Sequence, residues 1–326
     1  MNRWLALVVA LVAVVLLAAG GWLGYRWVFH TDPAPVAPEY VDRGEKLPTQ
    51  KEFDERAKTD PIKALEAGLT RYQREVPGGL RCVVEKQERI QGYPKHPELP
   101  TVEVLELCVR GDVPDPKTKQ TAIEVLVTWR EGAKSFLRAD IVGTLFSERP
   151  EPEGLGGKAV TWRPKALISP LSNPIPPNSE LARGQSRYCI RDAGLYRTML
   201  RTHEAWKARQ DAGEFKYEYL GTKVVEKAGN RECHVIRRLC PRVELDAFEL
   251  GGTASTDPKV VAEEGFTEVT IYLDRERWFQ VATETYRTEP DGTRVLVGSY
   301  YFREVELNPT FAPDTFTKGN LKKSGR

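Results

Sequence analysis

The chain has few side chains whose spacing would support metal binding. Its four histidines are His30, His96, His203 and His234, and no two of them have the spacing of metal ligands. The nearest approach to a metal cluster is Cys233-His234 with Cys240. Neighbours on a strand point to opposite faces, and the gap to Cys240 spans more than about 20 Å of extended chain. We therefore predict no metal site and no cofactor.

Candidates for acid–base or nucleophilic catalysis are equally weak. His203, beside Glu204 on the apolar face of a predicted helix, is interpreted as a core histidine rather than a base. No GxSxG, Walker, GxGxxG or HExxH motif occurs. Glu85, Glu88 and Arg89 are interpreted as the solvated face of a strand. These patterns predict a protein that is not an enzyme, with no catalytic residues.

Large apolar side chains give a second kind of candidate site. Seven of them are candidates to line a ligand cavity: Trp129, Phe136, Trp206, Ile271, Val281, Tyr301 and Phe302. The alternative is that they form an ordinary packed core. Small barrels are filled by their own side chains, whereas larger or open ones hold a ligand. The sequence leaves both possibilities open.

The charge balance argues against nucleic acid as a partner. Lysine and arginine number 48 against 46 acidic residues, and the basic residues are scattered rather than clustered on one element. The clearest partner signal lies instead near the N-terminus, where residues 4–25 form an uncharged apolar run. As a helix this run is roughly 33 Å long, enough to cross a bilayer.

This run predicts a transmembrane anchor over residues 1–30, with the bilayer as its partner. The protein would then be a single-pass protein of the inner (cytoplasmic) membrane, with its C-terminal domain in the periplasm. The alternative is export after cleavage of a signal peptide, because Ala18 and Gly20 are small enough for a processing site. Trp22, Tyr25 and Trp27 favour the anchor, since aromatic residues gather where a helix leaves the bilayer.

The rest of the chain divides into three predicted parts. Residues 31–59, rich in proline and charge, predict an extended linker. Residues 60–320 predict one folded domain, and residues 321–326 a basic tail. A hairpin of residues 80–90 and 102–110 would place Cys82 opposite Cys108. A disulfide between these cysteines and two buried free thiols are both open.

Alternating apolar residues and turn signals predict a mostly antiparallel domain. Three long strands over residues 266–308 form a meander, because Val269, Ile271 and Leu273 alternate with polar residues and Asp291-Gly292 favours a tight turn. Further hairpins are expected over 122–142 and 215–239, with another strand at 158–162. Helices are expected from Pro61 and from Asp192. The fold class is α+β: an N-terminal transmembrane helix, then a large curved antiparallel sheet of about ten strands forming an unclosed barrel, with two or three packed helices.

Four segments in a fixed order resemble a known family. They are VVEKQERIQG (83–92), RYCIRDAGL (187–195), ECHVIRR (232–238) and SYYFREVELN (299–308), followed by Asp314, Phe316 and Asn320. Together they resemble domain of unknown function 1571, a family of exported, mostly planctomycete bacterial proteins, over residues 60–320. The order of helices and strands also resembles the LolA-type lipoprotein-carrier fold, in which an unclosed barrel wraps an apolar cavity. That resemblance implies a lipid or lipoprotein acyl chain as ligand, although an anchored protein cannot diffuse as a carrier.

Two hypotheses follow from these patterns. The first is a membrane-anchored envelope protein that binds a lipid, acyl chain or other apolar ligand in a half-barrel cavity. The second is a structural or protein-interaction module of the envelope with a filled core, whose protein partner is unknown. A pocket of several hundred Å³ favours the first, and an exposed apolar patch favours the second.

Overall fold

The computed structural model describes residues 40, 42–89, 102–114, 121–132, 135–136, 139–166, 170–245 and 258–323. Across these ranges, none of the helices combines the length and the apolar character that a membrane crossing requires. The anchor predicted over residues 4–25 lies outside the described residues and stays a prediction.

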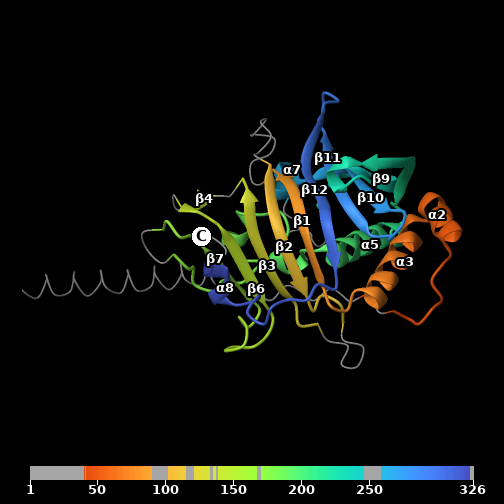
Figure 1. Ribbon diagram of the computed structural model, residues 1–326. Coiled ribbons are helices and arrows are strands. Elements are labelled where there is room, and N and C mark those ends of the chain that lie inside the picture. The colour runs from red at the N-terminus through yellow and green to blue at the C-terminus, as the bar shows by residue number, and fades with distance from the viewer. Residues whose placement is uncertain are drawn as a thin grey trace, which may run out of the picture.

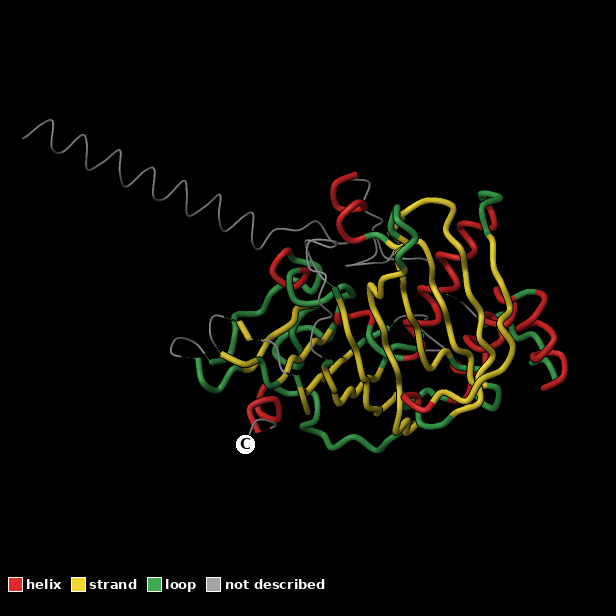
Figure 2. The backbone as a smooth tube through the Cα atoms, turned by 90° about the horizontal axis from the view of Figure 1, so that it is seen from above, coloured by secondary structure: helices red, strands yellow, loops and turns green. Residues whose placement is uncertain are grey.

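A single antiparallel sheet of ten strands forms the centre of the fold, in the order β7-β6-β3-β2-β1-β12-β11-β10-β9-β8 (Figure 1). The strands are β1 Leu80–Glu88, β2 Glu103–Arg110, β3 Glu124–Glu131, β6 Gly143–Ser147, β7 Lys158–Trp162, β8 Lys216–Val225, β9 Arg231–Glu244, β10 Phe266–Asp274, β11 Gln280–Thr288 and β12 Arg294–Leu307. Strands β7 and β8 lie at opposite ends of the order, and the strands form one curved row when seen from above (Figure 2). The predicted unclosed antiparallel sheet of about ten strands is confirmed.

Three longer helices pack together beside this sheet. They are α2 Gln50–Thr59, α3 Pro61–Glu75 and α5 Leu195–Asp211, and α5 runs behind the sheet in Figure 1. Three shorter helices complete the described α-helices: α4 Glu180–Arg183, α7 Pro258–Glu264 and α8 Lys318–Lys323. The two predicted domain helices are present, α3 with Asp60 as its N-cap and proline in its first turn. Their apolar faces join the concave side of the sheet in one core.

The C-terminal segment covers the opposite face of the sheet. Phe316 and Leu321 are buried there against Cys108, Leu126 and Leu145. Residue 321 therefore belongs to the domain rather than to the basic tail in which the sequence placed it, because its side chain completes this second apolar cluster.

Two hairpins follow the sequence closely and a third does not. The meander β10–β11–β12 and the hairpin β8–β9 form as predicted, with positive φ at Gly229 and Gly292 in their turns. The predicted pairing of residues 122–130 with 134–142 is wrong. Strand β3 pairs with β6, while the intervening chain makes only the short pair β4 Ser135–Phe136 and β5 Ala139–Asp140.

The register of β1 and β2 favours two free thiols, one of the two possibilities that the sequence left open for Cys82 and Cys108. Cys108 lies opposite Arg81, and Cys82 lies opposite Leu107. Because successive strand residues point to opposite faces, this offset of one residue places the two thiols on different faces of the sheet. Cys82 is buried in the main core and Cys108 in the second cluster, both as free thiols.

The last ten residues of the predicted linker over residues 31–59 form helix α2 and belong to the folded domain. Thr49 and Glu52 form a reciprocal capping box that starts α2. Phe53 on this helix is fully buried and stacks on Trp278, with ring centroids 4.8 Å apart. Residues 50–59 are therefore a core element, and the part of the predicted linker over residues 31–39 lies outside the described residues.

A polar chain fixes the same helix to the sheet. His234 on β9 bonds Asp54 of α2 through Nε2 at 2.8 Å and the Tyr219 hydroxyl through Nδ1 at 2.9 Å. Arg275 donates to the other Asp54 oxygen at 3.0 Å. Burial raises the pKa of Asp54, but hydrogen bonds from Arg275, His234 and Gln50 outweigh it and lower that pKa to about 2. The ionised carboxylate is thus the form that holds α2.

Replacing Phe53 with alanine tests whether α2 belongs to the core. We expect the free energy of unfolding to fall by about 3–5 kcal/mol, because a fully buried aromatic side chain is lost and a cavity is left. Urea unfolding followed by circular dichroism measures this change. The matched control is Glu55→Ala on the exposed side of the same helix, expected within about 0.5 kcal/mol of wild type. A Phe53→Ala variant as stable as this control would restore the linker interpretation.

Replacing Asp54 with asparagine tests the polar chain. Because the folded pKa of Asp54 lies below its ordinary value of 3.8, its stabilisation is complete above that pH and is lost as the pH falls toward 2. We expect Asp54→Asn to lose about 1.5–3 kcal/mol at pH 7 and the deficit to shrink as the pH falls through 4. Urea midpoints at several pH values give the comparison, with Asp211→Asn, at the exposed C-terminal end of α5, as control. A deficit that stays constant down to pH 3 would contradict this assignment.

Candidate functional site

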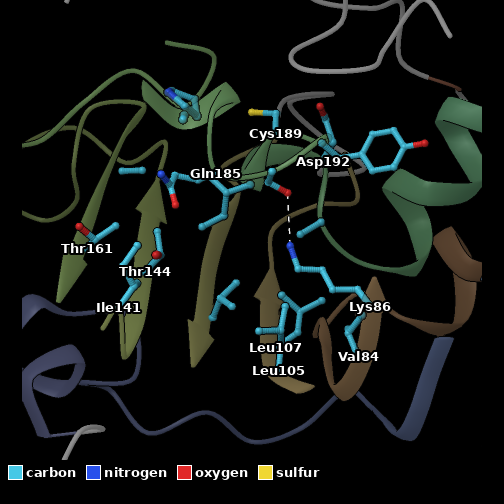
Figure 3. Close-up of a pocket in the computed structure, with 18 of the residues that line it drawn as sticks. Val84, Lys86, Leu105, Leu107, Ile141, Thr144, Thr161, Gln185, Cys189 and Asp192 are labelled. Carbon is cyan, nitrogen blue, oxygen red and sulfur yellow. Dashed lines mark hydrogen bonds between the residues drawn. The ribbon is translucent and has the colours of Figure 1, made fainter. Parts of the chain in front are cut away.

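A cavity of about 610 Å³ lies on the concave side of the sheet. Its floor is formed by inward-facing residues of β1, β2, β3, β6, β7 and β12, and α5 closes one side. Figure 3 shows Val84, Lys86, Leu105 and Leu107 rising from the strands toward Gln185 and other residues above them. Cavities of this volume are typical of small-molecule sites.

The roof of the cavity is the segment of residues 163–194, which we term the covering segment; residues 167–169 lie outside the described part. Prolines interrupt it repeatedly, so it cannot continue as a helix or as a strand of the sheet. It returns alongside β7 through two isolated bridges, Ala159 with Ile175 and Trp162 with Leu171. These bridges satisfy part of its backbone while leaving the space beneath it unfilled.

The other end of the covering segment is tied to the sheet by side chains. Arg187 is almost fully buried and donates to the backbone oxygens of Arg89 and Glu264, at 3.1 and 2.9 Å. Arg191 donates to Glu148 at 2.7 Å. The covering segment is therefore held at both ends, with the cavity between the two attachments.

Most of the cavity wall is apolar. Val84, Leu105, Leu107, Val127 and Phe302 face it from the strands. Ile175, Pro177, Leu181 and Ile190 face it from the covering segment. The arrangement can remove an apolar ligand from water, at about 0.8 kcal/mol for each methylene buried.

The structure distributes the seven predicted cavity residues between two environments. Trp129 and Phe302 line the cavity. Trp206, Ile271, Val281 and Tyr301 are buried in the main core, and the Phe136 side chain lies outside the described part of the chain. For these four residues, the structure therefore matches the alternative of an ordinary packed core.

One part of the cavity wall is polar and consists of Lys86, Glu88, Ser186 and Tyr300. Together with Glu103 of β2, which contacts Lys86 but does not line the cavity, we term this group the polar wall. The Lys86 ammonium lies 3.0 Å from a Glu88 oxygen and 3.4 Å from a Glu103 oxygen. Glu88 also accepts from the Tyr300 hydroxyl at 2.8 Å and from the Ser186 hydroxyl at 3.1 Å. The polar wall therefore joins β1, β2 and β12 to the covering segment.

The protonation state of Lys86 limits what this group can do chemically. Burial lowers the pKa of Lys86, but the nearby carboxylates of Glu88 and Glu103 outweigh it and raise that pKa above its ordinary value. Ser186 lies 3.4 Å from the Lys86 nitrogen. A serine–lysine nucleophile pair requires a neutral amine as base, whereas this lysine is an ammonium. The polar wall is suited to hydrogen bonding rather than to proton abstraction.

Sequence reasoning missed the polar wall because it assigned Glu88 to a solvated strand face. That assignment is wrong: Glu88 and the adjacent Arg89 are 6 % and 5 % exposed. Position 88 shares its face with Val84 and Lys86, four and two residues earlier, and this face is the concave one. The alternation with Val84 was the available signal.

The histidines that were considered for catalysis or metal binding, His203 and His234, do not line the cavity. His203 on α5 contacts Glu66 at 3.2 Å, and His234 belongs to the chain that holds α2. The described residues contain no group of three or more histidine, cysteine or acidic side chains placed to hold a metal ion. His30 and His96 lie outside those residues.

Replacing Lys86 with methionine tests whether its ammonium stabilises the carboxylates of Glu88 and Glu103. We expect the free energy of unfolding to fall by about 3–5 kcal/mol, because two buried carboxylates lose their cation. The control is the triple variant Lys86→Met, Glu88→Gln, Glu103→Gln, which removes all three charges and should recover a substantial part of the loss. Urea unfolding at pH 7 measures both. A triple variant no more stable than the single one would show that the charges are not coupled.

Comparisons with known proteins give one family and several distant structures. No curated protein matches the chain. Similar solved structures include a DUF1329 family protein from Desulfovibrio piger ATCC 29098, 12% identical, covering 80% of this chain and 99% of that one with a TM-score of 0.36. MucB is 12% identical, with 79% of this chain and 63% of MucB covered and a TM-score of 0.40. A beta-barrel-like DUF1849 protein from Brucella abortus is 10% identical, with coverages of 71% and 98% and a TM-score of 0.16.

The family match agrees with the four segments identified in the sequence. A family described as "Protein of unknown function (DUF1571)" matches residues 79–324, from the start of β1 to the end of α8. This range contains the whole sheet and every residue that lines the cavity. Since the match spans well over half of the chain, the protein belongs to the DUF1571 family.

Proposed function

We propose that this protein is a membrane-anchored, non-enzymatic protein of the cell envelope that binds a lipid, an acyl chain or another apolar ligand in its cavity. The observation that carries the proposal is the cavity itself, about 610 Å³ of largely apolar space beneath the covering segment. The anchor rests on the apolar run of residues 4–25. Binding proceeds by burial of apolar surface, so it requires no reacting group.

Entry and release would occur by movement of the covering segment. Its attachment near β7 consists of two isolated bridges, and its other attachment depends on side-chain bonds of Ser186, Arg187 and Arg191. Neither attachment is a continuous ladder of the kind that holds the strands together. The covering segment can therefore be displaced without opening the ladder of the ten-stranded sheet.

A protein-interaction role is the second candidate, and one feature favours it. Leu220 and Val224 on the edge strand β8 are 48 % and 54 % exposed. An exposed strand edge with apolar side chains is a place where another chain can pair. This role leaves the cavity without a purpose, so we rank it below ligand binding.

Filling the cavity tests the proposal. Native mass spectrometry of the full chain, released from nanodiscs after mild purification, should show a co-purifying apolar molecule. The variant Leu105→Trp should reduce its occupancy by about tenfold or more, because an indole occupies the floor of the cavity. The matched control is Glu106→Trp, which adds the same side chain on the opposite face of β2 and should retain the ligand.

Two results would contradict ligand binding. The first is an empty wild-type chain that also fails to take up an added apolar probe. The second is equal occupancy in Leu105→Trp and Glu106→Trp, which would place the bound molecule outside the cavity. Urea unfolding of both variants confirms that they are folded.

A further inference from the structure

A buried arginine lines the cavity from the α5 side. Arg201 is 7 % exposed, and its guanidinium carbon lies 3.7 Å from the centre of the Tyr188 ring in the covering segment. Among the described residues, this guanidinium makes no hydrogen bond and no ion pair. Arginine keeps its charge in proteins, and burying a charge without hydrogen-bond acceptors is costly. The cavity therefore contains a cation whose donors are available to a ligand.

Asp192 is a carboxylate of the cavity wall on which Arg201 acts electrostatically. Burial raises the pKa of Asp192, and that rise is opposed by the positive charges of three arginines, Arg201, Arg197 and Arg191. The Asp192 carboxylate thus interacts with several guanidinium groups, and it forms no ion pair with Arg201. It does not occupy the N–H donors of Arg201.

The position of the Tyr188 ring leaves these donors accessible. A guanidinium is planar and its N–H groups lie in its plane, so a ring over one face positions the group without accepting its hydrogen bonds. A guanidinium held in this way can bind a carboxylate or a phosphate through two parallel hydrogen bonds. Thr198 lies three residues before Arg201 on the same face of α5, lines the same cavity, and has a hydroxyl that can donate as well.

Other cations at this end of the cavity already interact with acceptors of the protein. The Lys86 ammonium contacts the carboxylates of Glu88 and Glu103 at 3.0 and 3.4 Å. Arg187 donates to two backbone oxygens, at 3.1 and 2.9 Å. Arg201 differs from both because its guanidinium meets no acceptor among the described residues.

Arg201 lies at the same end of the cavity as the polar wall. Tyr188, which lies next to Arg201, also packs edge-on against Tyr300, with ring centroids 5.2 Å apart. Figure 3 shows Lys86 of β1 at this end and Thr161 of β7 at the other. Four strand spacings, roughly 19 Å, separate these two strands, and the apolar floor of β2 and β3 lies between them. A ligand can therefore place a polar head near α5 and an apolar chain over the floor.

We propose that the cavity takes an amphiphile whose head group carries a carboxylate or a phosphate, and that Arg201 binds this head group with Thr198 beside it. The inference rests on the proposed function and specifies its ligand class. The head group accepts hydrogen bonds from the guanidinium, and the chain lies along the floor from β1 toward β7. A ligand without an acceptor would leave the buried guanidinium facing hydrocarbon.

The test compares probes that share a chain of similar length. Myristate, tetradecyl phosphate and methyl myristate are added at pH 7.5 to the full chain in nanodiscs, at free concentrations matched with empty nanodiscs, and bound probe is counted by native mass spectrometry. We expect at least one anion to bind about tenfold or more tightly than the methyl ester, because only an anion forms a charge-assisted pair with Arg201. The anion with the larger advantage identifies the head group. A methyl ester that binds as tightly as both anions would overturn the inference.

Replacing Arg201 with glutamine should remove the advantage of the anion. We expect anion affinity to fall about tenfold or more while the affinity for methyl myristate changes by less than about threefold, since only the head group loses its partner. The matched control is Lys207→Gln, which removes a positive charge from an exposed position of the same helix and should leave anion affinity unchanged. Equal losses in the two variants, or a full anion preference in folded Arg201→Gln, would overturn the inference.

Two further variants cover an unstable glutamine variant and a different anion position. If Arg201→Gln does not fold, Arg201→Lys should lose part of the preference, because an ammonium lacks the planar fork of donors. A lysine variant with the full preference would then overturn the inference. Arg163 lines the cavity beside β7. If Arg163→Gln lowers anion affinity and the Arg201 variants do not, the anion binds at the β7 end, and the inference fails while ligand binding stands.

Failure of the proposed function gives a different result. In that case none of the three probes binds and no molecule co-purifies with the wild-type chain.

Discussion

The structure depends on how the concave face of a wide antiparallel sheet is covered. Helices α3 and α5 cover only part of the concave face of the ten-stranded sheet. The remainder is covered by the covering segment, which contains only the short helix α4 and a 3-10 turn. Its prolines, Pro164, Pro170, Pro174, Pro176 and Pro177, prevent a longer helix or a strand of the sheet. A helix would press a row of side chains onto the strands, as α5 does elsewhere. An irregular segment bridges the strands and leaves a cavity, so the position of the cavity follows from the distribution of proline.

Buried charged side chains determine where the covering segment lies on the sheet. A buried ion pair contributes little net stability compared with apolar residues of the same size. Its geometric demands are strict, however, because each carboxylate oxygen must meet a donor. Glu88 meets Lys86 from its own strand, Tyr300 from β12 and Ser186 from the covering segment. The polar wall thus fixes where the covering segment lies relative to β1 and β12.

The sequence predicted the features that depend on local pattern. The meander was predictable because Val269, Ile271 and Leu273 alternate and a glycine with positive φ follows at Gly292. Helix α2 was missed because the prolines before it dominated the composition, although the capping box of Thr49 and Glu52 was visible in the sequence. The choice between a disulfide and two free thiols at Cys82 and Cys108 stayed open because it depends on a register offset of one residue, which turn composition does not fix.

The cavity itself could not be predicted from local sequence patterns. Trp129 and Phe302 were identified by residue type, but so were four residues of the filled core, because hydrophobicity alone does not distinguish a wall from a core. Lys86 and Glu88 were not identified as cavity residues because they are charged. Charged residues on a strand are usually solvated, and only the three-dimensional placement of the covering segment removes these two from water.

The states of the polar groups around the cavity agree with binding rather than catalysis. Burial and the Glu88 carboxylate raise the pKa of Tyr300, which keeps its phenol protonated. Burial raises the pKa of Cys189 well above its ordinary value, so its sulfur stays a thiol rather than the nucleophilic thiolate. Lys86 is held as an ammonium by two carboxylates. Catalytic sites shift such groups toward their reactive forms, whereas these three are shifted away from them. In these protonation states the three groups can donate hydrogen bonds.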